Sequence, residues 1–111
     1  MEKKKVLIID DEQDFGILLK GFFVRKNYEV FLSYTLTDGM QMLETIEPDF
    51  IFLDNNLPDG LGWSKTEYIL EKFPNAQLNL ISAYYVPKTS ASIFRILEKP
   101  ISIAELDKLF V

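Results

Sequence analysis

Five short apolar runs, each followed by polar or turn-forming residues, constrain this chain more than any other feature of its sequence. Between the runs, apolar residues recur every three or four positions, as on the buried face of an amphipathic helix. Strands that alternate with helices form a parallel sheet with right-handed crossovers and helices on both faces. The sequence therefore predicts a doubly wound α/β fold. Its five strands are expected at residues 6–9, 28–32, 50–53, 78–81 and 93–97.

The third run, Phe50-Ile51-Phe52-Leu53, leads directly into Asp54. A short apolar run bounded by turn signals is typical of a strand buried on both faces. Asp54 is then expected where a parallel strand ends, at the sheet edge where open α/β folds bind their ligands. Other polar residues follow predicted strands and so share this edge. They are Asp10, Asp11, Ser82 and Lys99.

Helices are expected at about residues 15–26, 36–46, 63–73 and 103–110, with Asn27 as the end of the first. Thr35 with Asp38, and Ser102 with Glu105, resemble capping boxes at the second and last helix starts. Residues 83–92 differ, since they lack a helical stripe, contain Pro87 and are rich in Ser and Thr. Proline breaks helices, and short hydroxyl side chains favour local turns. We therefore expect a turn-rich or extended segment there, with at most one helical turn.

The composition limits the classes of protein to consider. With 111 residues and 48% hydrophobic residues, the chain suits one domain, residues 1–111, with its own core. It has no cysteine or histidine, which excludes disulfides, thiolate or imidazole metal sites and a histidine base. A net charge of -5 argues against nucleic acid as the direct partner. No run is long enough for a membrane span or a signal peptide, so we expect a cytoplasmic location and no membrane contact.

The polar residues at the predicted sheet edge favour phosphoryl transfer. The three carboxylates of Asp10, Asp11 and Asp54 repel one another unless a cation neutralises them. Hard oxygen ligands suit Mg²⁺, and an aspartate can act as a nucleophile that forms an aspartyl phosphate. Lys99 and the Ser82 hydroxyl are suited to holding phosphoryl oxygens. Each residue alone is more often an ordinary turn, cap or surface residue, but the set indicates metal-assisted phosphoryl transfer onto Asp54.

The chain resembles the receiver domain of two-component response regulators over essentially its whole length. The matching stretches are Ile8-Ile9-Asp10-Asp11-Glu12, Leu53-Asp54 with Leu57-Pro58, Ile81-Ser82-Ala83, and Lys99-Pro100. The resemblance implies a flavodoxin-like fold with strand order 2-1-3-4-5. It also implies a phosphorelay role, in which a sensor histidine kinase or phosphotransfer protein is the partner. Such a domain is a signalling phosphoacceptor rather than an enzyme with a separate substrate.

The resemblance also implies individual roles. Asp54 would accept a phosphoryl group from a phosphohistidine. Mg²⁺ would be held by Asp11, Asp54 and the backbone carbonyl of Asn56, with Asp10 acting largely through water. Ser82 and Lys99 would each contact a phosphoryl oxygen, and the bond before Pro100 is expected to be cis, which is plausible only before proline.

Three departures from the family pattern affect these expectations. Leu61 stands where the family usually has an aspartate before Gly62. Ile96 occupies the switch position that usually holds Tyr or Phe, so the switch pair is expected to be Ser82 and Ile96. The interval from Ser82 to Lys99 is too short for the family's fourth helix, which we expect to be degenerate. Dimerisation through that helix, the fifth strand and the fifth helix is therefore not expected, and the output partner stays open.

The same sequence features allow other interpretations. A receiver-like interaction domain that signals without phosphorylation is the main alternative, because the short interval and Ile96 both alter the usual output. A phosphatase of the haloacid-dehalogenase type needs an acid two residues after the nucleophile, where this chain has Asn56. A nucleotide site at Gly60-Leu61-Gly62 lacks the third glycine.

Overall fold

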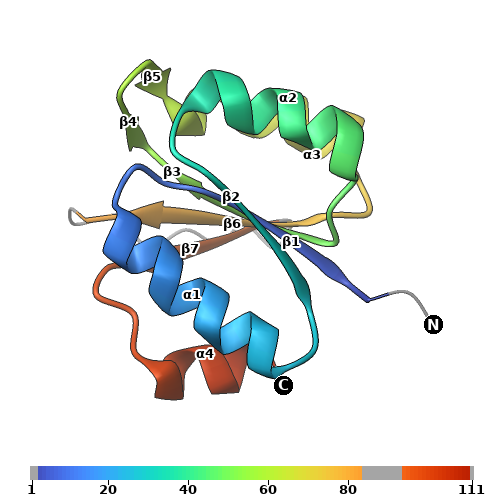
Figure 1. The fold of residues 1–111 in the computed structure, drawn as a ribbon. Helices are drawn as coiled ribbons and strands as arrows, with labels where there is room; N and C mark the ends of the chain where they lie inside the picture. Colours follow the sequence, from blue (N-terminus) through green and yellow to red (C-terminus); the bar gives the residue numbers. More distant parts are fainter. Residues whose placement is uncertain (1–2, 84–93, 111) are drawn as a thin grey trace.

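A five-stranded parallel sheet forms the centre of the molecule (Figure 1). The computed structural model describes residues 3–83 and 94–110. The strands of the sheet are β1 (Lys5–Ile9), β2 (Glu29–Ser33), β3 (Phe50–Asp54), β6 (Gln77–Ser82) and β7 (Phe94–Glu98). They lie in the order β2-β1-β3-β6-β7 and all neighbouring pairs are parallel. The predicted fold class is confirmed.

A small hairpin, β4 (Asn56–Leu57) and β5 (Gly60–Leu61), lies between the third and fourth strands of the main sheet in the chain, so the last two strands of that sheet are labelled β6 and β7. Strands β4 and β5 pair with each other in a second, antiparallel sheet. Counted within the main sheet alone, the order is second, first, third, fourth, fifth, as the resemblance implied. The sequence predicts turns after Asp54, and the hairpin is an addition to that prediction.

Helices cover both faces of the sheet (Figure 1). The first face carries α1 (Gln13–Arg25) and α4 (Ile103–Leu109), whose buried side chains share one core cluster with β1 and β3. The second face carries α2 (Leu36–Ile46) and α3 (Thr66–Lys72), and a 3-10 turn, η1 (Gly62–Lys65), leads into α3. The prediction of a degenerate fourth helix falls on residues 84–93, which lie outside the described part of the chain.

Aromatic side chains dominate the core beneath α1 and α4. The ring of Phe23 lies 5.6 Å from that of Phe52 and 5.3 Å from that of Phe110, between ring centroids. Phe52 and Phe110 are themselves 5.5 Å apart. Such tilted and edge-to-face contacts add to the free energy of burying the rings. The core therefore joins the first and last helices of the chain to the central strand.

Local signals in the sequence place the helix ends. Ser102 and Glu105 form the predicted capping box of α4. Thr35 accepts a hydrogen bond from the amide of Asp38 at the start of α2. Asn27 follows the end of α1 with a left-handed backbone, φ 68°, which asparagine tolerates better than most residues. Within the described residues, no helix is long and apolar enough to cross a membrane.

One polar residue lies inside the sheet. Asn79 of β6 is fully buried, and its Nδ2 donates to the carbonyls of Ile51 at 3.2 Å and Gln77 at 3.4 Å. Its Oδ1 has no hydrogen-bond partner among the described residues. The amide thus adds a link between β6 and β3, at the cost of an acceptor that stays unsatisfied.

Candidate functional site

The structure brings the predicted site residues together at the carboxyl edge of the sheet. Asp10 follows β1, and Asp54 and Ser82 are the last residues of β3 and β6. All three are buried, with 2%, 5% and 6% of their surface exposed. Lys99 follows β7, and its backbone N–H donates to the Ser82 carbonyl at 2.8 Å. The two strands are thereby joined beside the carboxylates.

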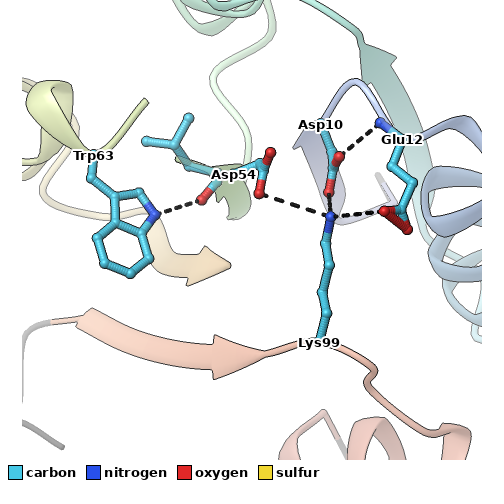
Figure 2. A network of polar contacts seen from close by, with 6 residues as sticks. Asp10, Glu12, Asp54, Trp63 and Lys99 are labelled. Carbon is cyan, nitrogen blue, oxygen red and sulfur yellow. Dashed lines mark hydrogen bonds and ion pairs between the residues drawn. The ribbon is translucent and has the colours of Figure 1, made fainter. Parts of the chain in front are cut away.

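The ammonium group of Lys99 lies among three carboxylates (Figure 2). Its Nζ is 2.8 Å from Asp10 Oδ2, 3.6 Å from Glu12 Oε2 and 3.8 Å from Asp54 Oδ1. The ring of Phe15 lies 4.6 Å from the same nitrogen, which adds a cation–π contact. Asp10 is held from its other side by the backbone N–H of Glu12, at 2.9 Å from Oδ1. Lys99 is therefore paired most closely with Asp10.

Three acids at this edge are suited to a divalent cation. Asp10, Asp11 and Asp54 each offer a carboxylate oxygen, and these oxygens lie within 4.8 Å of one another. Only one cation, Lys99, contacts this group in the described residues, so negative charge remains in excess. Because hard oxygen donors with open positions are what Mg²⁺ prefers, the donor set fits that ion. Asn56, the expected carbonyl ligand, is exposed and opens β4 two residues beyond Asp54.

Burial raises the pKa of Asp54 to about 6. The negative charges of Asp10 and Asp11 act in the same direction, whereas Lys99 opposes them. Burial also raises the pKa of Asp10, despite its hydrogen bond with Lys99. For Lys99, burial alone lowers the pKa, but the contact with Asp10 and the charges of Asp54 and Glu12 outweigh it and raise the pKa. The site therefore holds a firmly protonated lysine beside carboxyl groups that bind protons readily.

The loop after Asp54 is tied back onto the end of β3. The indole N–H of Trp63 donates to the Leu53 carbonyl at 3.2 Å, as Figure 2 shows. The amides of Gly62 and Trp63 donate to the backbone and side-chain oxygens of Asn55, at 2.8 Å and 3.1 Å. A Cβ atom on Gly62 would clash with the backbone oxygen of Asp54. These contacts fix the backbone on both sides of Asp54.

Two further predictions concern β7 and its end. The bond between Lys99 and Pro100 is cis, as expected. Ile96, the predicted switch residue, pairs in register with Leu80 and packs half-buried against the core beneath α2 and α3. Its role as a switch stays a prediction.

Some residues of the site were not predicted. Glu12 and Phe15 contact the Lys99 ammonium, whereas the sequence alone indicates no role for Glu12 and only a place on a helical stripe for Phe15. For Trp63 the sequence predicts a helix start and not the contact with β3. The one available signal was the position of Glu12 directly after the acidic pair, since a chain leaving a strand end stays near that edge.

Comparison with known proteins identifies the family. The response regulator receiver domain family matches residues 6–110. The response regulator protein PilR of Pseudomonas aeruginosa is 28% identical over 114 residues, which cover 98% of this chain and 26% of PilR. The regulatory protein VanR of Enterococcus faecium is 32% identical over 68 residues, which cover 61% of this chain and 29% of VanR. The chain thus spans under a third of the length of these two relatives.

Solved structures agree with the sequence relatives. The signal receiver domain of a putative Luxo repressor protein from Vibrio parahaemolyticus superimposes with a TM-score of 0.83 at 25% identity, covering 97% of this chain and 87% of that one. A CheY-like receiver domain from Methanospirillum hungatei gives a TM-score of 0.86 at 22% identity, covering 97% and 90%, and so supports the fold. With the family match and the grouped acids and lysine, the conclusion is direct: the chain belongs to the response regulator receiver domain family.

Proposed function

We propose that this domain accepts a phosphoryl group on Asp54 from a phosphohistidine of a sensor kinase or phosphotransfer protein. The observation that carries the proposal is the position of Lys99 between Asp10 and Asp54, at the strand ends where three carboxylates meet. A nucleophilic carboxylate, an acidic metal-binding group and a cation for phosphoryl oxygens are the parts that this reaction needs. The domain then acts as a phosphoacceptor in the cytoplasm, and not as an enzyme with a separate substrate.

Asp54 supplies the nucleophile. One of its carboxylate oxygens forms a bond to phosphorus while the bond from phosphorus to the donor's imidazole nitrogen breaks. Because the pKa of Asp54 is about 6 in the metal-free protein, the side chain is a carboxylate in most molecules at neutral pH and is available for attack. Burial keeps water away from the acyl phosphate once it has formed.

The neighbouring residues stabilise the transferred group. Asp10, Asp11, Asp54 and the Asn56 carbonyl would hold Mg²⁺, which would neutralise charge on the phosphoryl oxygens when bound. Lys99, now 3.8 Å from Asp54 Oδ1, is close enough to pair with another of these oxygens after a small movement away from Asp10. The Ser82 hydroxyl, from the end of the adjacent strand, would contact a third. Movement of Ser82 and Ile96 would then carry the change to the output surface.

The decisive experiment measures the intact mass after incubation with acetyl phosphate and Mg²⁺. We expect a single phosphate adduct in the natural protein, no adduct when EDTA replaces Mg²⁺ during the incubation, and none in Asp54→Asn. A protein without an adduct would instead support a receiver-like domain that signals through constitutive contacts. An adduct that persists in Asp54→Asn would place the acceptor elsewhere.

A surface beside the site suits the phosphodonor protein. A groove runs from Lys99 and Pro100 to Phe15 and Leu18 of α1. Leu18 and the adjacent Ile17 are 40% and 62% exposed, so they form an apolar strip beside the groove that leads to Lys99. We infer that the donor protein packs on this strip, since apolar contacts at the centre of an interface supply most of its affinity.

Two charge substitutions test this surface. Leu18→Asp should slow phosphoryl transfer from a phosphohistidine protein at least about tenfold, because it places a charge within the apolar contact. Transfer from acetyl phosphate should not change, since that donor needs no docking surface. Tyr68→Asp is the control, because Tyr68 is similarly exposed, at 42%, but belongs to α3 on the opposite face of the sheet. Equal slowing by both substitutions would rule out docking at Leu18.

A further inference from the structure

The β4–β5 hairpin is fastened to the start of α2 by one side chain. Pro58 and Asp59 form the loop between the paired residues Leu57 and Gly60. The Asp59 carboxylate reaches across to α2, where Oδ1 accepts from the Leu36 amide at 2.7 Å and Oδ2 from the Thr37 amide at 2.8 Å. The bonds with Thr37 and Leu36 lower the pKa of Asp59 to about 2. The carboxylate is therefore charged and engaged at every physiological pH.

Asp59 completes a cap that α2 does not supply alone. The first amides of a helix have no partner inside the helix. Thr35, the residue before α2, takes the Asp38 amide with its side chain and the Gly39 amide with its carbonyl. The first two amides, of Leu36 and Thr37, donate to Asp59, which lies 23 and 22 residues further along the chain and is their one acceptor in the described part of the structure. The helix start thus has one local and one distant cap.

Apolar packing reinforces this contact. Leu57 and Leu36 are 8% and 7% exposed and belong to the same core cluster. A Cβ on Gly60 would lie 3.3 Å from Leu36, so the hairpin backbone approaches the helix closely. At its other end the hairpin begins at Asn56, directly after the Asn55 backbone that Gly62 holds. A short chain of contacts therefore runs from Asp54 through the hairpin to α2.

We propose that Asp59 is a positioning residue of the metal site, which fixes the hairpin that carries the Asn56 carbonyl and couples that site to the start of α2. The inference rests on the proposed function, because it takes the Asn56 carbonyl as a metal ligand. Asp59 does not touch the metal or the phosphoryl group itself. Its effect comes from holding the hairpin backbone in place before the ion arrives, so that binding need not order it.

The competing explanation is that Asp59 only stabilises α2. Thr35 separates the two possibilities, because it caps the same helix end but forms no hydrogen bond with the hairpin within residues 3–83 and 94–110. Thr35→Ala and Asp59→Ala therefore both weaken the helix start, whereas only Asp59→Ala releases the hairpin. Comparison of these variants distinguishes positioning of the site from stability of the helix.

The experiment titrates Mg²⁺ alone into each protein by calorimetry and follows backbone amides by NMR. Asp59→Ala should bind Mg²⁺ about tenfold more weakly, the lower end of what loss of an outer partner costs a metal site. Asp59→Asn should lie between, because one amide oxygen can replace only one of the two acceptors. Thr35→Ala should bind within about twofold of the natural protein, since the metal site is intact. In the natural protein, Mg²⁺ should shift the Leu36 and Thr37 amide signals, and this shift should be absent in Asp59→Ala.

The outcomes separate the inference from the function on which it rests. Equal Mg²⁺ affinity in Asp59→Ala, Thr35→Ala and the natural protein would overturn the positioning role and leave the proposed function intact. A natural protein that binds no Mg²⁺ would overturn both. If Asp59→Ala does not fold, Asp59→Asn decides the matter, and an affinity equal to that of the natural protein would overturn the inference.

Discussion

The side chain of Lys99 determines how the charges of the carboxylates at this site are compensated. Its Nζ lies nearer to the carboxylate of Asp10 than to that of Asp54, at 2.8 Å against 3.8 Å. The positive charge of Lys99 therefore neutralises mainly Asp10, and the negative charge of Asp54 is compensated less. Any cation that binds among the carboxylates competes with Lys99 for Asp10 and frees the ammonium group for another partner.

The raised pKa of Asp54 makes stability depend on pH. A carboxyl whose pKa is about 6 in the folded protein and 3.8 in the unfolded chain holds its proton more tightly when folded. Stability therefore falls as pH rises from about 4 to 6, by about 3 kcal/mol for a shift of this size. Asp54→Asn avoids this loss, so we expect it to be the more stable protein at pH 8 without metal. Urea unfolding in EDTA across pH 4.5–8 measures the difference, and a difference independent of pH would contradict the assignment.

Loss of the lysine should cost more than loss of a surface cation. In Lys99→Met the buried Asp10 has no cation, and removing one partner of a buried pair costs about 3 kcal/mol. The exposed pair of Lys26 and Asp107, 3.3 Å apart, offers the control, and Lys26→Met should cost less than about 1 kcal/mol. Urea unfolding at pH 7 compares the two, and equal losses would show that burial does not strengthen the contact.

At the scale of elements, the hydrophobic periodicity predicted the strands of the main sheet and the helices correctly, but several of their ends differ in the structure. The run 78–81 predicted β6, but the strand extends over Gln77–Ser82 because the flanking backbone continues the parallel pairing. A helix is expected from Trp63, yet Gly62–Lys65 form a 3-10 turn, in which the Thr66 amide donates to the Trp63 carbonyl three residues earlier. Asn55, from the end of β3, accepts from the amides of Gly62 and Trp63 that open this turn. Such ends depend on contacts with other segments, which periodicity does not contain.

Helix α4 has a cap that can be tested on its own. The Ser102 hydroxyl accepts from the Glu105 amide at 3.1 Å, and the Glu105 side chain bonds back to the Ser102 amide. Ser102→Ala should lower the free energy of unfolding by about 1 kcal/mol because it leaves that amide unpaired. Ser102→Asp should restore most of the loss, since aspartate is an equally good cap. Thermal unfolding checks both, and an unaffected alanine variant would show that α4 does not depend on its cap.

At the scale of the whole molecule, the fold explains why the main site residues were predictable. Parallel strands all end at the same edge, so residues that follow buried runs share that edge, where the Lys99 side chain reaches Asp10 and Asp54. The contacts of Trp63 with Leu53 and of Asp59 with Leu36 were not predictable in this way. These contacts join the segment after Asp54 to β3 and α2, and neither the spacing of residues nor the hydrophobic period specifies such pairs.

Metal binding should stabilise the whole domain. A ligand that binds only the folded state raises stability by about 2.7 kcal/mol at a concentration one hundred times its dissociation constant. We expect Mg²⁺ to raise the melting temperature of the natural protein and to have a smaller effect on Asp11→Ala than on Asp10→Ala, because Asp11 is the expected direct ligand. NaCl at equal ionic strength is the control for screening. Equal effects of Mg²⁺ on both variants would contradict the assigned roles.

The crowding at Gly62 bears on attempts to make a more heat-resistant variant of this domain. Replacing glycine by alanine is a common engineering step, because it reduces the freedom of the unfolded chain. Gly21, in the middle of α1, follows that rule, since a Cβ there would meet only the end of the Arg25 side chain, 3.5 Å away, and we expect a gain of up to about 1 kcal/mol. At Gly62 the same change would push a methyl group into the backbone of Asp54. A library of such substitutions, sorted for thermal survival, should therefore retain alanine at position 21 and eliminate it at position 62.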